Sequence, residues 1–229
     1  MYSLTAIIPF YNEELFLKKS VDRLLDNDVF DQIILTDDCS TDSSPEIAKI
    51  YEQKNEKISY VRNEANGGKG SALNKAFQHL QTTHVVIHDA DLEYDPFDIK
   101  ELKRLSIQHP DSLILGSRFI GEKERKNLYL RTYLANKVMS LFFSIVNLYT
   151  ITDVATCYKL MPSNFVKGVN LQEQGFSIEI ELLSKFLKYN KSVVESPISY
   201  EGRSYEEGKK IKTTDGVFYL LNTLKYRFF

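Results

Sequence analysis

The sequence predicts an α/β fold, with a mostly parallel sheet and helices on both of its faces. The first of three observations supports this fold class, and the other two define the domain organisation. Short apolar runs alternate with amphipathic stretches of helical length through the first half of the 229 residues. No linker rich in Gly, Ser or Pro divides the chain, and no internal repeat is present. The alternation breaks down after Gly116, which indicates a single domain over 1–229 with an elaborated C-terminal third.

Five apolar runs bounded by polar or turn residues predict the strands. They are Leu4–Ile8, Gln32–Thr36, Ile58–Val61, Val85–His88 and Leu113–Leu115. Four helical patterns connect them, namely Glu13–Leu25, Pro45–Asn55, Ser71–Leu80 and Pro96–Ile107. The second and fourth helices carry Pro in the first turn, after a Ser or an Asp that suits a helix cap. Alternation at these lengths gives right-handed βαβ units, which place helices on both faces of a sheet.

The C-terminal third contains a different set of elements. The charged stretch Glu122–Lys126 predicts an exposed loop. The other expected elements are helices over 133–149, Ile178–Tyr189 and Val217–Phe229, a strand over Ser192–Glu195 and a polar loop over 201–212.

Two of these helices have a composition that suits a membrane surface. In 133–149, five polar residues fall on one narrow stripe, which is typical of either a buried helix or a helix in a bilayer interface. Those residues are Asn136, Lys137, Ser140, Ser144 and Asn147. The last helix ends in a basic and aromatic segment, 225–229, that suits a headgroup layer. Ordinary amphipathic packing is the alternative for both helices. No run reaches ~18 apolar residues, so we expect no transmembrane helix.

Composition narrows the classes of partner and compartment. The net charge of −2 and the pI of about 6.1 argue against a nucleic-acid partner. Cys39 and Cys157 are the only cysteines, which favours a reducing compartment over a disulfide framework. The first residues lead directly into a strand, so no signal peptide is expected. These features together predict a cytoplasmic protein.

Polar clusters follow three predicted strands at the point where each strand ends. They are 9–14, 37–42 and 89–93. The carboxyl ends of parallel strands share one edge of a sheet, where α/β folds bind ligands. Asp89 and Asp91 are two residues apart, so in extended backbone their carboxylates point the same way. Alone, this pair fits a solvated turn as well as a cation site. Several carboxylates at one edge repel each other unless a cation or hydrogen-bond donors compensate them, which favours Mg²⁺ or Mn²⁺ bound together with a nucleotide diphosphate.

Glycines and cations provide a second group of candidates. The glycine-rich loop Asn63–Ser71 opens a helix, a position that attracts anions, although it could also be a turn without a ligand. It is not a P-loop, because Asn63 and Gly70 stand where Gly and Ser or Thr are required. Several cations lie downstream and suit phosphate oxygens or an anionic lipid. They are Arg118, Arg131, Arg203, Lys209, Lys210 and Lys212.

Taken together, these motifs resemble those of family 2 glycosyltransferases with the GT-A fold. The motifs, in order, are Ile7–Glu14, Asp37–Asp42, Asn66–Gly70, Asp89–Pro96 and Gly116–Phe119. Pro197–Tyr200, Arg203 and Glu207–Lys210 add a similarity to the dolichyl-phosphate mannosyltransferase type, which loads a sugar onto a polyprenyl phosphate. The resemblance covers nearly the whole chain. It implies a GT-A fold with a nucleotide-sugar-binding part, 1–118, and an acceptor and membrane-proximal part, 119–229.

The resemblance also implies a role for individual residues. Those assigned to the nucleotide sugar are Pro9, Tyr11, Glu13, Thr36, Asp38, Asp89, Ala90 and Lys209. Those assigned to the metal, Mg²⁺ or Mn²⁺, are Asp89, Asp91 and Glu93. Arg131 is expected on the acceptor phosphate, and the residues expected to act in catalysis are Asp91, Arg118, Arg203 and Asp153. Two departures are expected to matter. Cys39 stands where Gly is usual, which suggests a different turn, and Glu93 stands where Gln can occur.

The implied reaction is an inverting transfer of a hexose from GDP-mannose or a UDP-sugar to a polyprenyl or dolichyl phosphate. A phosphate acceptor is already an anion, so cations matter more than a base; Asp153, Glu179 and Glu181 are the base candidates. Two alternatives remain, a family 2 transferase acting on a hydroxyl of a glycan or lipid, and a non-catalytic nucleotide-sugar-binding protein. Many such enzymes carry transmembrane helices after this domain, and this sequence has none. We therefore expect peripheral attachment to the cytoplasmic face of a membrane, through the surface or a small membrane-protein partner.

Overall fold

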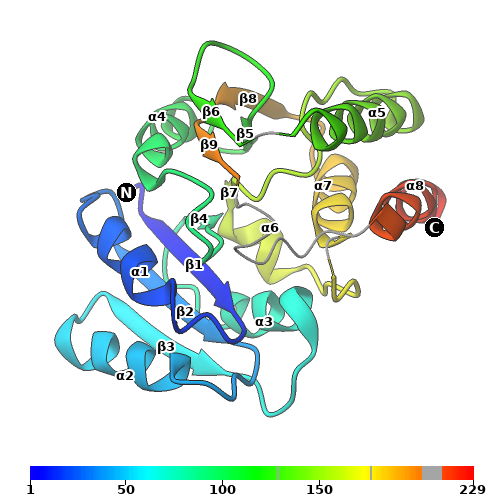
Figure 1. The fold of residues 1–229 in the computed structure, drawn as a ribbon. Coiled ribbons are helices and arrows are strands. Elements are labelled where there is room, and N and C mark those ends of the chain that lie inside the picture. Colours follow the sequence, from blue (N-terminus) through cyan, green and yellow to red (C-terminus); the bar gives the residue numbers. More distant parts are fainter. Residues whose placement is uncertain (128, 176, 203–212) are drawn as a thin grey trace.

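The computed structural model describes residues 1–229 except 128, 176 and 203–212. Within this part of the chain, the main sheet has the strand order β3-β2-β1-β4-β7-β5-β8 (Figure 1). The strands are β1 (Leu4–Phe10), β2 (Gln32–Asp37), β3 (Ile58–Arg62), β4 (His84–Ile87), β5 (Leu113–Ser117), β7 (Lys159–Pro162) and β8 (Val193–Pro197). All neighbouring strands pair in parallel except β7, which is antiparallel to both β4 and β5. The predicted mostly parallel sheet is confirmed.

Helices pack on both faces of this sheet (Figure 1). Their bounds are α1 (Leu17–Leu25), α2 (Ser44–Lys54), α3 (Gly68–Phe77), α4 (Ile99–Gln108), α5 (Leu130–Asn147), α6 (Ser163–Lys167), α7 (Ile178–Tyr189) and α8 (Thr213–Phe228), with a 3₁₀ turn η1 (Pro96–Asp98) before α4. Side chains of β1 alternate between two buried clusters. Ile8 joins α1, α2 and α4 on one face, and Ile7 joins α3, α5, α6, α7 and α8 on the other.

Three local predictions are corrected. The strand β7 was not predicted, because only Leu160 and Met161 lie between a buried lysine, Lys159, and Pro162. The first helix begins at Leu17 rather than Glu13. The backbone N–H groups of Glu13 and Glu14 instead donate to Ser44 and Asp42, which ties that turn to the loop after β2. The charged segment predicted as an exposed loop contains a short strand.

That short strand is β6 (Arg125–Lys126), which pairs in parallel with β9 (Tyr200–Glu201). An isolated bridge joins Tyr94 to Tyr200, next to this two-stranded sheet. The segment after β4 is therefore attached to the C-terminal third of the chain. This attachment positions one side of the candidate site.

In the C-terminal third, α8 packs against both α5 and α7 (Figure 1). The polar stripe predicted on α5 faces the protein: Asn136, Ser140 and Asn147 are buried. The hydroxyl of Ser140 accepts from the backbone N–H of Val154, and the amide of Asn147 donates to the carbonyl of Phe143. Phe143 of α5 is also buried, whereas Leu134, Val138, Leu141 and Ile145 are exposed on its other side. Among the described residues, no helix combines the length and hydropathy required to span a bilayer.

Candidate active site

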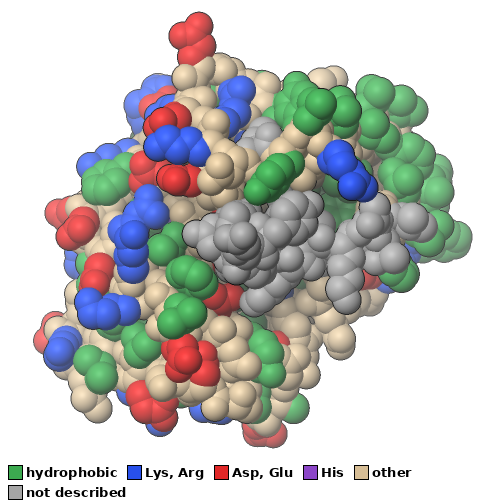
Figure 2. All heavy atoms as spheres, in the orientation of Figure 1, with side chains coloured by type: hydrophobic (Ala, Val, Ile, Leu, Met, Phe, Trp, Pro, Cys, Tyr) green, Lys and Arg blue, Asp and Glu red, His purple; other side chains and the backbone are tan. Residues whose placement is uncertain are grey.

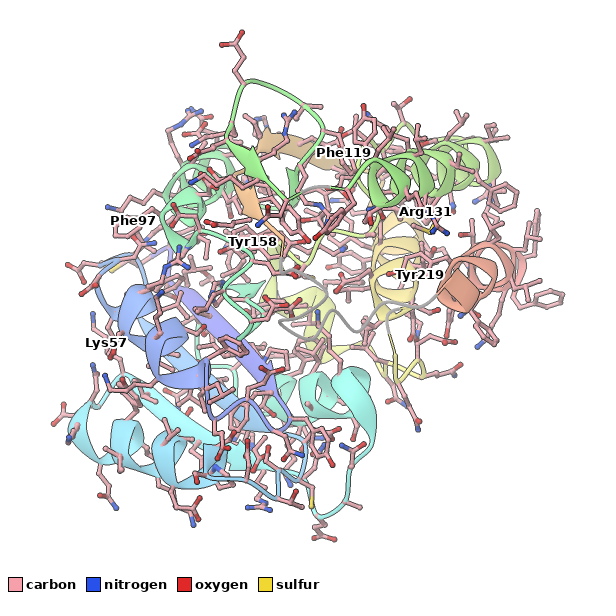
Figure 3. The ribbon with its side chains drawn as sticks, viewed as in Figure 1. Lys57, Phe97, Phe119, Arg131, Tyr158 and Tyr219 are labelled. Carbon is pink, nitrogen blue, oxygen red and sulfur yellow. The ribbon has the colours of Figure 1, made fainter. Side chains whose placement is uncertain are left out.

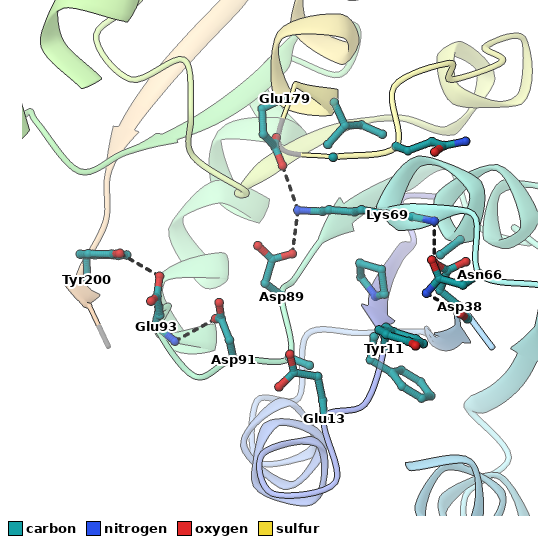
Figure 4. Close-up of a pocket in the computed structure, with 18 residues that line it drawn as sticks. Tyr11, Glu13, Asp38, Asn66, Lys69, Asp89, Asp91, Glu93, Glu179 and Tyr200 are labelled. Atoms are coloured by element: carbon teal, nitrogen blue, oxygen red, sulfur yellow. Dashed lines mark hydrogen bonds and ion pairs between the residues drawn. The ribbon is translucent and has the colours of Figure 1, made fainter. Parts of the chain in front are cut away.

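A cavity of about 380 Å³ opens at the carboxyl ends of β1, β2 and β4 (Figure 4). The residues that line it come from the end of β1, from the segments after these strands, from α3 and the loop before it, from the loop before α7 and the start of α7, and from β9. They are Pro9, Phe10, Tyr11, Glu13, Asp38, Asn66, Gly68, Lys69, Ala72, Asp89, Ala90, Asp91, Glu93, Gln174, Gly175, Ile178, Glu179 and Tyr200. The expected convergence of the three strand-end clusters on one edge is therefore observed.

The acidic segment after β4 forms one wall of this cavity. The backbone N–H of Glu93 donates to Asp91 Oδ1 at 3.2 Å, and the hydroxyl of Tyr200 donates to Glu93 Oε2 at 2.8 Å (Figure 4). The carbonyl of Glu93 accepts from the backbone N–H of Glu201. Leu92 has φ +66°, a left-handed conformation that is costly for a bulky residue. Hydrogen bonds from β9 thus hold a strained turn in which Asp91 faces the cavity.

Asp89, the other member of the aspartate pair, is ion-paired. Its Oδ1 lies 2.7 Å from the ammonium of Lys69, which also lies 2.9 Å from Glu179 Oε1 (Figure 4). Burial lowers the pKa of Lys69, but the nearby carboxylates of Asp89 and Glu179 outweigh it and hold the pKa well above its usual value. Burial likewise raises the pKa of Glu179, but Lys159 and Lys69 bring it below its ordinary value. Lys69 therefore stays protonated in this acidic cavity.

The start of α3 is fixed by Asp38. Its carboxylate accepts from the backbone N–H groups of Gly67 and Gly68 and from the amide of Asn63. Gly68 has φ +80°, and a Cβ there would lie 2.2 Å from the carbonyl oxygen of Gln174. A Cβ at Gly70 would lie 2.1 Å from the carbonyl oxygen of Glu173. Glycine at both positions therefore lets the loop before α7 close one side of the cavity.

The acidic residues of the cavity fit a metal ion only in part. Over the described residues, no group of three or more His, Cys, Asp or Glu side chains is arranged to hold one. The expected set of Asp89, Asp91 and Glu93 is therefore not gathered into a three-ligand site, since Lys69 and Tyr200 engage the two outer members. Mg²⁺-type ions, however, are commonly held by one or two carboxylates together with water and substrate phosphates. The aspartate pair offers the hard oxygen donors that such an ion requires.

Comparison with known proteins gives the chain a family. Residues 5–166 match the family described as glycosyl transferase family 2. The chain belongs to this family. It is 31% identical to a UDP-N-acetylglucosamine–dolichyl-phosphate N-acetylglucosaminyltransferase of Methanococcus voltae, over 96% of this chain and 94% of that protein. It is 29% identical to a dolichol-phosphate mannosyltransferase of Pyrococcus furiosus, over 90% of this chain and 58% of that protein.

Solved structures confirm the fold of this family 2 glycosyltransferase. Glucosyl-3-phosphoglycerate synthase from Mycobacterium tuberculosis, crystallised with Mn²⁺, UDP and glucosyl-3-phosphoglycerate, superposes with a TM-score of 0.73 at 15% identity. The superposition covers 99% of this chain and 80% of that one. The GT-A architecture expected from the motifs is therefore present.

Two residues expected to act in catalysis lie outside the cavity of the glycosyltransferase. Arg118 is 5% exposed and Asp153 is fully buried. The backbone N–H, Nε and Nη2 of Arg118 all donate to the Asp153 carboxylate, at 3.0, 2.7 and 2.8 Å. The guanidinium also lies 5.1 Å from the ring centre of Tyr200, which does line the cavity. Asp153 therefore has a buried partner in Arg118 and does not line the cavity.

Other expected residues divide between the cavity, the core and the surface. Pro9, Tyr11, Glu13 and Ala90 line the cavity as expected. Thr36 does not, because it is fully buried and its hydroxyl donates to the carbonyl of Ala72.

Arg131 is exposed at the start of α5, away from the cavity lining (Figure 3). Arg203 and Lys209 lie outside the described residues, as do Lys210 and Lys212.

Sequence reasoning missed several residues that build this glycosyltransferase cavity. Lys69 was noted only as part of a glycine-rich loop, and Glu179 only as a base candidate. Glu181 is also buried, and its carboxylate accepts from the backbone N–H groups of Gln172 and Glu173. Lys69 and Glu179 are 110 residues apart, so no local spacing could reveal their ion pair. The glycines at 68 and 70 were the available signal, since they indicate close approach of another segment.

Proposed function

We propose that this chain transfers a sugar from a nucleotide diphosphate sugar to a polyprenyl or dolichyl phosphate. The observation that carries the donor half of the proposal is the aspartate pair at the carboxyl end of β4, in a cavity also lined by Asp38 and Tyr11. The acceptor half is supported by the relative from Methanococcus voltae, whose name gives dolichyl phosphate as acceptor and which aligns with 96% of this chain.

Asp91 and Asp89 would hold a divalent ion, Mg²⁺ or Mn²⁺, on the donor diphosphate. Such an ion supplies positive charge where negative charge grows on the leaving diphosphate. The glucosyl-3-phosphoglycerate synthase of similar fold was crystallised with Mn²⁺ and UDP together, which is a reason to test Mn²⁺ beside Mg²⁺. The protein's own contribution is to hold the donor against Asp38 and Tyr11 and to keep Asp91 toward its phosphates.

A phosphate acceptor fits the surroundings of the three base candidates. Asp153 is bound to Arg118 in the core, and Glu181 accepts backbone N–H groups. Glu179 lies between Lys159 and Lys69. Attack by a hydroxyl requires a base that can take its proton, whereas a phosphate monoester is already an anion near neutral pH. These engaged carboxylates therefore favour a phosphate acceptor, which would attack the anomeric carbon as the bond to the diphosphate breaks, with inversion.

The outward face of α5 supports a place at a membrane. Five apolar side chains on it, Leu134, Val138, Leu141, Ile145 and Leu148, are each 53–83% exposed. On the neighbouring α8, Phe218, Leu221, Leu224 and Phe228 are also exposed. We call these nine residues the apolar face; Figure 2 shows hydrophobic side chains gathered on this side of the molecule, over α5 and α8. A helix in water would turn its polar stripe outward, and α5 does the reverse.

The proposed occupant of the apolar face is an anionic bilayer. Arg131 and Lys137 on α5 and Arg227 on α8 supply cations on the same two helices, which complement lipid phosphates. Lys225 is instead paired with Glu173 at 2.8 Å. A polyprenyl phosphate resides in a bilayer, so this attachment would bring the enzyme to its acceptor. Helices lying in the plane of the interface fit this role, because they bind a membrane without crossing it.

The transfer assay uses labelled GDP-mannose, UDP-glucose and UDP-N-acetylglucosamine with a short polyprenyl phosphate and Mg²⁺ or Mn²⁺. We expect an organic-extractable product that mild acid hydrolyses. Asp91→Asn should abolish transfer, while Asp111→Asn, an exposed carboxylate far from the cavity lining, should leave it unchanged. Label found only on a saccharide or on protein would refute the lipid acceptor. Near-normal turnover by D91N would refute the role of the aspartate pair.

Vesicle flotation tests the apolar face separately. Leu141→Glu with Ile145→Glu should lower binding to phosphatidylglycerol-containing vesicles at least tenfold. Ile107→Glu serves as the matched control, because Ile107 is 55% exposed on α4, outside the apolar face. Equal flotation of both variants would argue against this surface. A concentration-dependent dimer that the double variant abolishes would assign the face to a second copy instead.

A further inference from the structure

Four alternating charges run from the core of the protein to the cavity. Lys159 is fully buried, and its ammonium contacts Glu179 Oε2 and the carbonyl of Thr156. Glu179 Oε1 lies 2.9 Å from Lys69, and Lys69 lies 2.7 Å from Asp89 (Figure 4). The side chain of Glu179 is 6% exposed, whereas those of Lys69 and Asp89 are 22% and 27% exposed. The row therefore begins as core structure and ends at the carboxylate expected to bind a metal.

Glu179 contacts both lysines, and Lys69 also contacts Asp89. Glu179 has Lys159 as a buried counter-ion, so the carboxylate stays compensated if Lys69 moves. The backbone of Lys69 is fixed, because its N–H donates to the carbonyl of Gln174 at 3.0 Å and the segment 173–174 packs closely against Gly68 and Gly70. Only the side chain is then available to move. Its ammonium contacts Asp89 Oδ1, an oxygen that a divalent ion would also bind.

We propose that Lys69 occupies the metal position on Asp89 in the free enzyme, so that a divalent ion binds tightly only together with the donor diphosphate. The inference rests on the proposed function. Two cations on one carboxylate oxygen repel each other strongly in a partly buried site. A diphosphate adds negative charge beside Asp89 and attracts the Lys69 ammonium toward its own oxygens. Asp89 then becomes available to the ion, and Lys69 adds a second positive charge beside the leaving group.

We call this contact of Lys69 with Asp89 the lock. It predicts that the affinity for a divalent ion differs with and without nucleotide. In the free protein, Mn²⁺ has to displace Lys69 from Asp89, so its affinity should be low. With GDP or UDP bound, the displacement has already occurred. Coupling of this kind is reciprocal, so Mn²⁺ should raise the affinity for the nucleotide by the same factor.

The experiment measures Mn²⁺ binding to the full chain by the electron paramagnetic resonance signal of free Mn²⁺. Lys69→Met keeps the apolar stem and removes the charge. Without nucleotide, K69M should bind Mn²⁺ at least tenfold more tightly than wild type, and saturating GDP or UDP should narrow the difference. Lys75→Met is the matched control, because it makes the same change of net charge on α3 outside the cavity lining. Lys69→Gln repeats the test with a polar side chain, and urea midpoints verify that each variant folds.

The outcomes separate the lock from the proposed function. If K69M and K69Q bind Mn²⁺ no more tightly than wild type without nucleotide, while wild type with nucleotide binds it well, the lock is wrong and the proposed function stands. If K75M tightens binding as much as K69M, the effect is one of net charge and the lock is again wrong. If neither wild type nor any of the variants binds Mn²⁺, even with GDP or UDP present, both proposals fail.

Discussion

The pair formed by Arg118 and Asp153 allows a sharp test of whether Asp153 is a base or a structural residue. Asp153→Asn removes the negative charge with little change in shape. In the folded protein, Arg118 would keep its position between the rings of Tyr94, Phe119 and Tyr200, with ring centres 5.1–6.0 Å away. An uncompensated guanidinium would then remain in the core. We therefore expect the main effect of the substitution on stability.

The magnitude follows from burial and from the number of bonds. Three donors of Arg118 converge on Asp153, and the side chains are 7% and 0% exposed. Removing one partner of such a buried pair costs about 3–5 kcal/mol. The exposed pair of Arg104 and Glu101 has the same two-bond geometry with side chains 54% and 46% exposed, and Glu101→Gln should cost below about 1 kcal/mol. Burial is the main difference between the two pairs.

Urea unfolding followed by circular dichroism measures both variants. The double variant Arg118→Met with Asp153→Asn should recover at least half of the loss, because it leaves no unpaired charge in the core. A loss below about 1 kcal/mol for D153N would refute the structural role. A fully stable D153N that lacks transfer activity would restore Asp153 as a base candidate.

Three further predictions concern backbone strain, packing and pH. Cys39 has φ +66°, so Cys39→Gly should stabilise the fold by about 1 kcal/mol in urea, whereas Cys39→Ala should not. Gly70→Ala should weaken nucleotide binding at least tenfold by calorimetry, because its Cβ would meet the carbonyl of Glu173 and push that loop away. Burial lowers the pKa of His88 to about 3. Below pH 6.5 the unfolded chain therefore binds a proton at His88, whereas His88 of the folded chain stays neutral. Wild type should lose about 2 kcal/mol between pH 6.5 and 5, and His88→Asn should lack most of that loss, with His84 supplying a smaller part in both.

Local patterns were enough to predict the first half of the fold. A buried parallel strand is a short apolar run, and turn chemistry marks its end, so both signals lie within a few residues of each other. The clusters at 9–14, 37–42 and 89–93 could therefore be assigned to one sheet edge before the topology was known. Cys39 is instructive, because the expected change of turn is not needed: the residue adopts the left-handed conformation that glycine favours.

Tertiary context decided what the sequence could not predict. The pattern of α5 defines an apolar and a polar side but not which one faces the protein. That orientation is set by partners such as Val154, whose backbone N–H requires the hydroxyl of Ser140. The strand β7 has only two apolar residues between Lys159 and Pro162, so it leaves no periodic signal. Lysine is rarely buried without a partner, and the partner here, Glu179, is distant in the sequence.

Residues of the part expected to bind the acceptor, 119–229, also build the cavity. Tyr200 and Glu201 of β9 hold Glu93, and thereby the turn that carries Asp91. The loop before α7 closes over the glycines of α3, and Glu179 anchors Lys69 on Asp89. The acceptor part therefore fixes the position of the carboxylates expected to hold the donor diphosphate. The apolar face lies on α5 and α8 of that same part, and α8 packs directly on the helix that carries Glu179. The proposed contact of this face with a membrane and the order of the cavity would therefore depend on one connected set of elements.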